Sequence, residues 1–278
     1  MINPILRMRL IKKCTPIAMT ITTLLLAIVP ESLIKKITLT SFLSEEANII
    51  LNRSIAIVLT FLATMILCHL YEKFQTQTKI NGKNYNVVVE YGDIFKINDC
   101  KKIIPFDECF TTKIGDSPAN VNLDSICGQY LKDHPINDMQ MQNLITIANL
   151  CPTGTKSAYQ NKTKYDSGFL IPKDDFLLMS FVKLNSEGLG TLSFEEFLKC
   201  LNVLWKEIDK YYGQQDVCIP ILGSGVTRFE GGTQPSKQEL IDIILCSYKI
   251  SQHKIKLPNC LRIVCRKSDD FSLNRIDN

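Results

Sequence analysis

Two short stretches of the sequence place chemically useful residues directly after an apolar run. In VVVEYGDIF, residues 87–95, a β-branched run is followed by Gly92 and then by Asp93. A carboxylate only accepts hydrogen bonds, so Asp93 suits an exocyclic amine such as that of adenine. The alternative interpretation is that Asp93 simply caps the next turn, as aspartates often do.

The second stretch is VCIPILGSGVTRFEGG, residues 217–232, in which an apolar run leads into Gly-Ser-Gly. Gly223 and Gly225 let the backbone approach a ligand closely, and successive N–H groups in such a loop form an anion nest. A diphosphate would also be favoured by the hydroxyl and cationic groups of Ser224, Thr227 and Arg228. The alternative is a strand-to-helix turn that needs glycine. The sequence has neither G-x-G-x-x-G after its first strand nor G-x-x-x-x-G-K-[ST].

The composition excludes several classes of protein. The 278-residue chain is 45% hydrophobic and 22% charged, with a formal net charge of +4, which is too weakly basic to indicate nucleic acid. The eleven cysteines form no C-x-x-C pair and the three histidines give no zinc spacing, so we expect no metal and no bound cofactor. The odd number of cysteines, several of them in apolar runs, indicates reduced, mostly buried thiols in a reducing compartment.

The sequence pattern also predicts a sheet that could position both stretches. Continuous apolar runs are typical of strands covered on both faces, and they lie at 87–91, 176–184, 217–222 and 261–265. Helices are indicated between them at 123–134, 193–213 and 236–250. The last two begin with capping boxes, Ser193 with Glu196 and Ser236 with Glu239. This alternation predicts an α/β fold with a mixed or largely parallel sheet, in which ligands bind beyond the carboxyl ends of the strands.

Two apolar segments precede this α/β region. Residues 14–29 and 54–71 carry no formal charge and would form helices of roughly 24 and 27 Å, against a hydrocarbon core of about 30 Å. We predict membrane spans at about 14–34 and 49–71, because neither segment has a polar face. The alternatives are a secretory signal peptide for the first segment, although no small-x-small cleavage site follows it, and buried core helices. Most threonines in these segments are expected to bond their own helix backbone.

The positions of lysine and arginine give a weak orientation, with both chain ends in the cytoplasm. The chain therefore divides, on this interpretation, into a transmembrane helical hairpin at 1–78 and a cytoplasmic domain at 79–278. The polar segment 74–84 is expected to be linker and turn, and 269–278 a loose tail.

Together, VVVEYGDIF and CIPILGSGVTRF resemble a macro domain, the ADP-ribose-binding fold with three α/β/α layers. The resemblance covers residues 79 to about 266, with IGDSPANVNLDSICGQYL in the place of a further ligand-facing loop. It implies that Asp93 and Ile94 hold adenine. It also implies that the diphosphate and distal ribose are held by Gly223, Ser224, Gly225, Val226 and Thr227, with Arg228 beside them and Phe229 packed against the sugar. The alternative for Phe229 is a core aromatic, which is the commoner role of such a residue.

The sequence departs from the macro-domain pattern where hydrolytic members carry their catalytic groups. The usual asparagine-rich segment is replaced by IIPFDECFTT, which brings Pro105, Phe106 and Asp107 to the expected ligand site. The usual glycine-dense loop is reduced to GDSPANVNLDS, in which Asn122 and Asp124 are the polar candidates. A solvated aspartate is the simpler interpretation of Asp107 and Asp124. We therefore expect ligand binding and assign no catalytic residue.

Two apolar segments followed by a divergent macro domain resemble the membrane-anchored macro-domain effectors of Thoeris anti-phage defence. PFDECF, ICGQYL and IPILGSGVTR carry this resemblance. It implies a multi-pass protein of the bacterial inner membrane that binds a histidine–ADP-ribose conjugate made by a partner TIR-domain protein. Binding would drive self-oligomerisation and disruption of the lipid membrane, and so abortive infection. The alternatives are a membrane-tethered ADP-ribosyl hydrolase and an ADP-ribose-binding scaffold.

Overall fold

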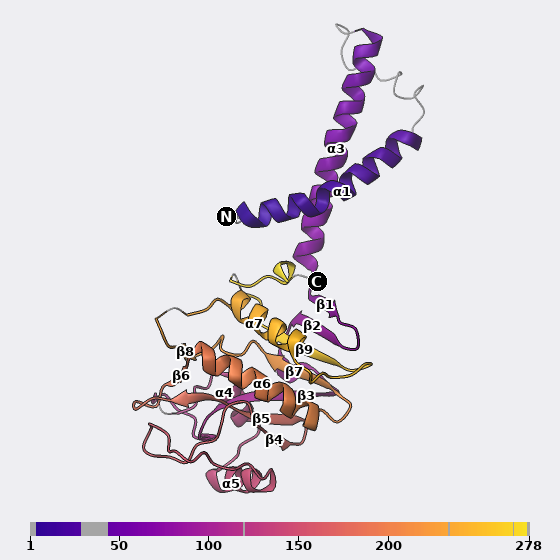
Figure 1. Cartoon of the computed structure of the whole chain (residues 1–278). Coiled ribbons are helices and arrows are strands. Elements are labelled where there is room, and N and C mark those ends of the chain that lie inside the picture. Colours follow the sequence, from indigo (N-terminus) through magenta and orange to yellow (C-terminus); the bar gives the residue numbers. More distant parts are fainter. Residues whose placement is uncertain (1–3, 29–43, 119, 233, 269, 277–278) are drawn as a thin grey trace. The chain divides into compact units, whose positions relative to one another are not determined.

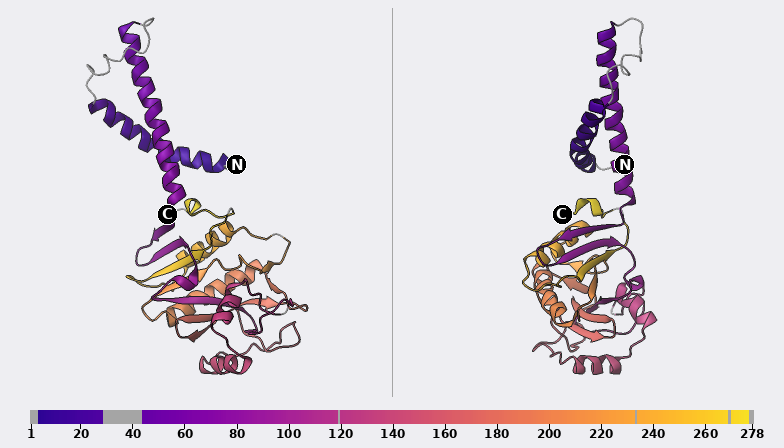
Figure 2. Two further views of the ribbon diagram at one scale, coloured as in Figure 1. Left: turned by 180° about the vertical axis from the view of Figure 1, so that it is seen from behind. Right: turned by 90° about the vertical axis from the view of Figure 1, so that its right-hand side faces the viewer.

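The structure is a computed structural model that describes residues 4–28, 44–118, 120–232, 234–268 and 270–276 (Figure 1). The chain divides into two compact units, residues 1–75 and 76–278. The first unit is helical and the second is built around a sheet (Figure 2).

The first unit consists of helices α1 (Pro4–Ile28) and α3 (Glu45–Phe74), which pack against each other. The face of α1 that is buried carries small side chains spaced four residues apart, namely those of Cys14, Ala18 and Thr22. Small residues at this spacing let two helix backbones approach closely. Ser44 caps α3, because its hydroxyl accepts a hydrogen bond from the Ala47 amide at 3.3 Å.

Helix α3 is long and apolar enough to cross a membrane, whereas the apolar part of α1, Cys14–Leu25, is shorter than a full span. The second predicted span, at about 49–71, lies within α3. The end of the first predicted span, beyond Ile28, lies outside the described residues.

The threonines of these helices satisfy their own hydroxyl groups. Each donates to the carbonyl oxygen four residues earlier, at 2.7–2.9 Å, in the six cases Thr15, Thr20, Thr22, Thr23, Thr60 and Thr64. The expectation of bonding within the helix is confirmed, and these hydroxyls can therefore enter an apolar medium at little cost.

The described part of the second unit forms one nine-stranded mixed sheet. Along the sheet the order is β1-β2-β9-β7-β3-β5-β6-β8, with β4 paired to β5. The strands are β1 (Gln77–Asn81), β2 (Asn86–Tyr91), β3 (Cys100–Asp107), β4 (Leu170–Lys173), β5 (Phe176–Leu184), β6 (Gly190–Leu192), β7 (Asp216–Pro220), β8 (Arg228–Phe229) and β9 (Cys260–Cys265). The five neighbours β2, β9, β7, β3 and β5 run parallel, so their carboxyl ends share one edge.

Helices cover both faces of this sheet, which gives three layers (Figure 2). Helices α6 (Phe194–Tyr211) and α7 (Lys237–Ile250) cover one face, and α4 (Ile126–Asp133) and α5 (Asp138–Ile147) cover the other. The predicted α/β fold and the strands at 176–184 and 217–220 are confirmed, and these strands are continuous apolar runs because both of their faces are buried.

Both predicted capping boxes are present. The Ser193 hydroxyl accepts from the Glu196 amide at 3.2 Å, and the Glu196 carboxylate accepts from the Ser193 amide at 3.0 Å. Ser236 and Glu239 repeat the arrangement at the start of α7. These caps satisfy amides that have no partner within the helix.

Replacing Ser193 with alanine is expected to lower the free energy of unfolding of the second unit by about 1 kcal/mol, because one helix amide loses its acceptor. The measurement is the midpoint and slope of urea unfolding followed by circular dichroism. Ser193→Asp should retain most of the stability, since aspartate also caps. Equal losses in the two variants would show that the capping bond is not the cause.

Two expectations about connecting segments are wrong. The segment 74–84 is not all linker and turn, because Gln77–Asn81 forms strand β1 and pairs with β2. Residues 271–276 are not loose, because Phe271, Leu273 and Ile276 are buried in the main core. Tyr91 holds this segment through its ring, 5.7 Å from that of Phe271.

Candidate functional site

The parallel strands bring the sequence-predicted residues to one edge of the sheet. Strand β2 leads into Gly92 and Asp93, β7 into the glycine loop, and β3 into the turn after Asp107. Carboxyl ends of parallel strands are where open α/β sheets bind ligands. The structure therefore places the two motifs on a common edge.

Asp93 caps a short 3-10 helix, η1 (Ile94–Lys96). Its Oδ1 accepts a hydrogen bond from the Phe95 amide at 3.1 Å, so the simpler interpretation, a capping aspartate, holds. The carboxylate remains half-buried, and among the described residues it has no further hydrogen bond. Ile94 is buried among residues of β3, β7 and β9 and fixes η1 to the sheet. One oxygen of Asp93 is thus left to accept a hydrogen bond from a ligand.

The glycine loop has the backbone geometry expected of a close approach. Gly223 has φ +82°, and a Cβ there would lie 3.0 Å from the Phe229 ring. Gly225 is exposed, and a Cβ there would meet nothing within 4 Å. Among the described residues, the amides of Gly225 and Val226 donate to no backbone carbonyl. Both amides are therefore available to an anion.

The other predicted residues of this loop have different environments. The Ser224 hydroxyl donates to the Ile221 carbonyl at 2.6 Å, so it stabilises the turn. Thr227 and Phe229 are buried, whereas Val226 and Arg228 are exposed. The Phe229 ring packs on Phe194 and Phe197, and it supports Gly223 from within the core.

Gln234 also holds the loop, and no sequence pattern indicates this role. Its Nε2 donates to the Gly223 carbonyl at 3.4 Å, and its Oε1 accepts from the Phe229 amide at 3.4 Å. The side-chain amide thus connects both ends of the loop. Such a role depends on a contact between residues eleven apart in sequence, which no local pattern encodes.

The residues that replace the asparagine-rich segment lie at the end of β3. Phe106 is buried and packs on Phe110 and Tyr130, so it belongs to the core. Pro105 is half-buried within the strand. Asp107 Oδ1 accepts hydrogen bonds from the amides of Cys109, at 2.8 Å, and Thr111, at 3.2 Å. Asp107 thus shapes the turn.

Burial raises the pKa of Asp107 above its ordinary value, while its hydrogen bonds and the charge of Lys162 act in the opposite direction. The carboxyl group is therefore a weaker proton donor than a solvated aspartate. A group already committed to two amides is poorly placed to act as a general base.

The loop before α4 approaches the same edge. Asp124 is exposed, and its amide donates to the Asn122 side chain at 2.7 Å. A Cβ at Gly128 would lie 2.1 Å from the Asn122 carbonyl oxygen, so glycine is needed for the loop to pack on α4. Arg266, just after β9, donates to Gln129 of α4 at 3.0 Å. These contacts bring the start of α4 close to the end of β9.

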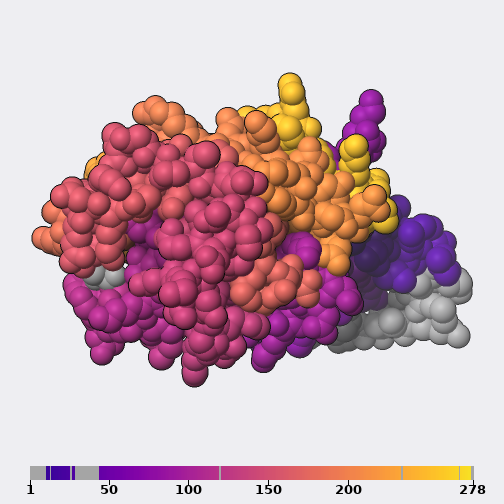
Figure 3. Space-filling view, turned by 90° about the horizontal axis from the view of Figure 1, so that it is seen from below, coloured from indigo at the N-terminus to yellow at the C-terminus, as the bar shows by residue number. Residues whose placement is uncertain are grey.

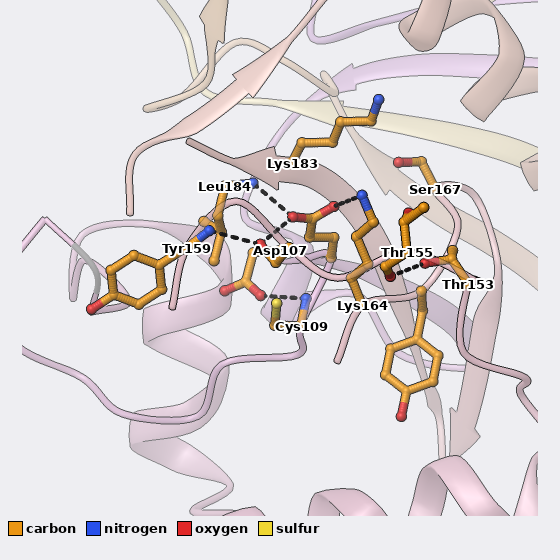
Figure 4. A network of polar contacts seen from close by, with 12 residues as sticks. Asp107, Cys109, Thr153, Thr155, Tyr159, Lys164, Ser167, Lys183 and Leu184 are labelled. Carbon is orange, nitrogen blue, oxygen red and sulfur yellow. Dashed lines mark hydrogen bonds and ion pairs between the residues drawn. The ribbon is translucent and has the colours of Figure 1, made fainter. Parts of the chain in front are cut away.

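A buried carboxylate, Glu108, organises the turn after β3, and sequence reasoning missed it. Figure 4 labels two of its partners, Lys164 and Leu184, in the surrounding network of polar contacts. Glu108 is 3% exposed, and its Oε1 accepts from the Ser157 hydroxyl at 2.5 Å and from the Leu184 amide at 3.2 Å. Lys164 Nζ lies 3.9 Å from the other carboxylate oxygen. Glu108 thus connects β3, the end of β5 and the segment before β4.

Within the described residues, the cysteine thiols and the metal-binding side chains form no second candidate site. No disulfide joins the cysteines of the described residues. Cys218 and Cys100 pack with Ile94, and 3.0 Å separates their sulfur atoms. The hydrogen bond that Cys218 donates lowers the pKa of the Cys100 thiol below its ordinary value. No group of three or more metal-binding side chains occurs in the part of the chain that the structure describes.

Comparison with known proteins agrees with this architecture. A family model described as the macro domain of Thoeris protein ThsA matches residues 87–266, so the second unit is a macro domain. The chain belongs to the Thoeris ThsA macro-domain family. It is also 27% identical over 248 residues to Thoeris protein ThsA of Bacillus amyloliquefaciens (strain Y2), covering 85% of this chain and 81% of that protein.

Among solved structures, the chain is similar to macrodomains of Oceanobacillus iheyensis. A point mutant is 13% identical with a TM-score of 0.45, and the alignment covers 72% of this chain and 95% of that one. A structure described as holding ADP is 12% identical with a TM-score of 0.41, covering 72% and 93%.

Proposed function

We propose that this protein is a membrane-anchored effector of bacterial anti-phage defence whose macro domain is the receptor for an ADP-ribose-type signal. The signal is a histidine–ADP-ribose conjugate made by a partner TIR-domain protein. Membership of the Thoeris family supports the defence role. The observation that carries the binding role is the common sheet edge shared by Asp93 and a glycine loop with unpaired amides.

The two motifs divide the ligand between them. The free oxygen of Asp93 accepts from the adenine amine, and Ile94 supports that segment from below. The amides of Gly225 and Val226 bind the diphosphate, with the exposed Arg228 adding positive charge. Because Ser224 and Phe229 stabilise the loop, they affect ligand binding through the shape of the loop.

The N-terminal unit is the membrane anchor in this proposal, with α1 and α3 as a two-span hairpin and the macro domain in the cytoplasm. Helix α3 is sufficiently long and apolar, and the intrahelical bonds of the threonines favour insertion of both helices. Ligand binding drives self-assembly only by its differential affinity for the assembled state. The assembled hairpins then disrupt the bilayer.

We assign no hydrolytic activity. Asp107 is committed to backbone amides, and Asp124 is exposed in a loop. An ADP-ribosyl hydrolase is the alternative, and its mechanism would need a carboxylate or an asparagine, such as Asn122, beside the distal ribose to position or activate water.

A vesicle assay distinguishes these functions. The full chain is reconstituted into vesicles that contain a self-quenched dye, and the histidine–ADP-ribose conjugate is added outside. The proposal predicts dye release only with the conjugate, and an intact conjugate afterwards. Release of free ADP-ribose would support the hydrolase instead. Binding without release of dye would support a scaffold.

Replacing Asp93 with asparagine is expected to weaken ADP-ribose binding at least tenfold without lowering the melting temperature. Asparagine still caps the turn through its oxygen, but its amide NH2 group, a donor, would then face the adenine amine, which is also a donor. Calorimetry with ADP-ribose measures the effect, with Asp175→Asn, an exposed residue beyond the amino end of β5, as the control. Unchanged affinity in Asp93→Asn would show that adenine does not bind there.

A further inference from the structure

The segment between α5 and β4 is unusually long for a connection without helix or strand. It runs from 148 to 169, whereas most connections in compact domains have about 4–6 residues. Its part 151–168, which we call the anchored loop, is nevertheless ordered by internal bonds. The Thr153 amide donates to the Lys164 carbonyl at 3.0 Å, and the Ser157 amide donates to the Lys162 carbonyl at 2.9 Å. Long ordered loops of this kind are usually functional.

The anchored loop is fixed at the carboxyl edge of the sheet by Glu108. Ser157 is 1% exposed, and its hydroxyl donates to this carboxylate at 2.5 Å. The Tyr165 amide donates to the Glu108 carbonyl at 2.8 Å. Burying a carboxylate costs free energy unless hydrogen bonds and a cation compensate it. The buried and hydrogen-bonded Glu108 therefore indicates that this part of the interior serves to hold the loop in place. In Figure 3, the segment from β3 to β4, coloured magenta to rose, covers much of the visible face.

The anchored loop carries three lysines, and two of them are already engaged. Lys164 pairs with Glu108, and Lys156 Nζ donates to the Thr163 hydroxyl at 3.0 Å. Lys162 has no carboxylate partner within the described residues, and its ammonium lies over the Tyr159 ring, 5.0 Å from the centroid. The Lys162 carbonyl accepts from the Ser157 amide, and the Ser157 hydroxyl bonds to Glu108, the residue after the last residue of β3, so Lys162 lies near the turn that ends this strand. Lys162 therefore brings a cation without an ion-pair partner among the described residues to the ligand edge.

We propose that the anchored loop determines which ADP-ribose derivative is bound, and that Lys162 recognises a carboxylate on the group attached to the distal ribose. This inference rests on the function proposed above. Adenine and diphosphate are assigned to the ends of β2 and β7, so the far end of the ligand extends toward β3. A carboxylate-bearing substituent would meet Lys162 there. Glu108 and Ser157 are positioning residues that hold the loop in place.

The test is calorimetry of the full chain in lipid nanodiscs with three ligands. They are ADP-ribose, its histidine conjugate, and the histamine conjugate, which differs from the second only by lacking the carboxylate. The unmodified protein should bind the histidine conjugate about fivefold more tightly than the histamine conjugate, which is the effect of one partly exposed charge pair. Lys162→Met should reduce this ratio to about one while its affinity for ADP-ribose changes less than twofold.

Lys173→Met is the matched control, because Lys173 begins the tight turn before the amino end of β5, at the opposite edge of the sheet. It should keep the fivefold ratio. An unchanged ratio in Lys162→Met, with normal ADP-ribose binding, would overturn this inference alone. Failure of the unmodified protein to bind any of the three ligands would overturn the proposed function and this inference with it.

The positioning role has a separate readout. Ser157→Ala should speed amide hydrogen exchange across 153–164 and lower the discrimination between the two conjugates, with ADP-ribose affinity retained. Exchange and discrimination both equal to those of the unmodified protein would contradict the anchoring role of Glu108 and Ser157.

Discussion

Gly225→Glu is expected to lower the affinity for ADP-ribose at least 100-fold and to leave the melting temperature unchanged. The fold should tolerate the change, since a Cβ at Gly225 meets nothing within 4 Å and the residue is exposed. Ligand binding should not tolerate the change, because the new carboxylate would occupy the position where the amides of Gly225 and Val226 bind a diphosphate. Two like charges about 4 Å apart repel by about 4 kcal/mol near a protein surface, which is more than a 100-fold loss requires.

Calorimetry and a thermal melt of the same samples measure both quantities. Gly225→Ala is the control, and it should bind within a few-fold of the unmodified protein. Gly223→Ala should behave differently, because φ +82° and the ring of Phe229 at 3.0 Å both oppose a side chain. It should lose about 1–2 kcal/mol of stability. Normal binding by Gly225→Glu would show that the glycine loop is not the diphosphate site.

Trp205→Ala is expected to lower the free energy of unfolding of the second unit by about 3–5 kcal/mol, the usual cost of removing a buried tryptophan. Trp205 is 1% exposed, and its ring lies 4.9 Å from that of Tyr248. Its Nε1 donates to the Ser247 hydroxyl at 3.1 Å. The side chain thus connects α6 to α7, the two helices that cover one face of the sheet.

Urea unfolding must be followed here by circular dichroism, because Trp205 is the only tryptophan and its removal eliminates the fluorescence signal. Ser247→Ala separates the hydrogen bond from the packing and should cost about 1 kcal/mol. A loss below about 1.5 kcal/mol for Trp205→Ala would show that α6 and α7 are held together by other contacts.

The elements that could be predicted from the sequence are those with a local signal. Strand β5 is a continuous apolar run, and α6 begins with a capping box, so both follow from neighbouring residues. Strand β3 lacks such a signal, because it begins with Cys100, Lys101 and Lys102 and contains a proline. It forms because β5 and β7 pair with it on either side. Strand β1 is polar on its exposed face and is defined by its pairing with β2.

The residues of the candidate site divide in the same way, into those with a local sequence signal and those whose role depends on distant contacts. Asp93 and Gly223 follow strands that the sequence indicates, so their place at a carboxyl edge could be predicted. The core position of Phe229 could be anticipated from sequence, but its partners Phe194 and Phe197 of α6 could not, because no local pattern encodes these contacts. The sequence around Glu108 is that of a solvated acid. Its burial depends on contacts with residues far away in the sequence, such as the hydrogen bond from Ser157.

The central claim is that the macro domain is a receptor for an ADP-ribose derivative, and one measurement tests it most directly. The full chain in nanodiscs is titrated by calorimetry with ADP-ribose, its histidine conjugate and NAD, and the ligand is recovered afterwards for mass spectrometry. We predict selective binding of the conjugate, at micromolar affinity or better, with the ligand recovered intact. Absence of binding, or recovery of hydrolysed ligand, would contradict the account.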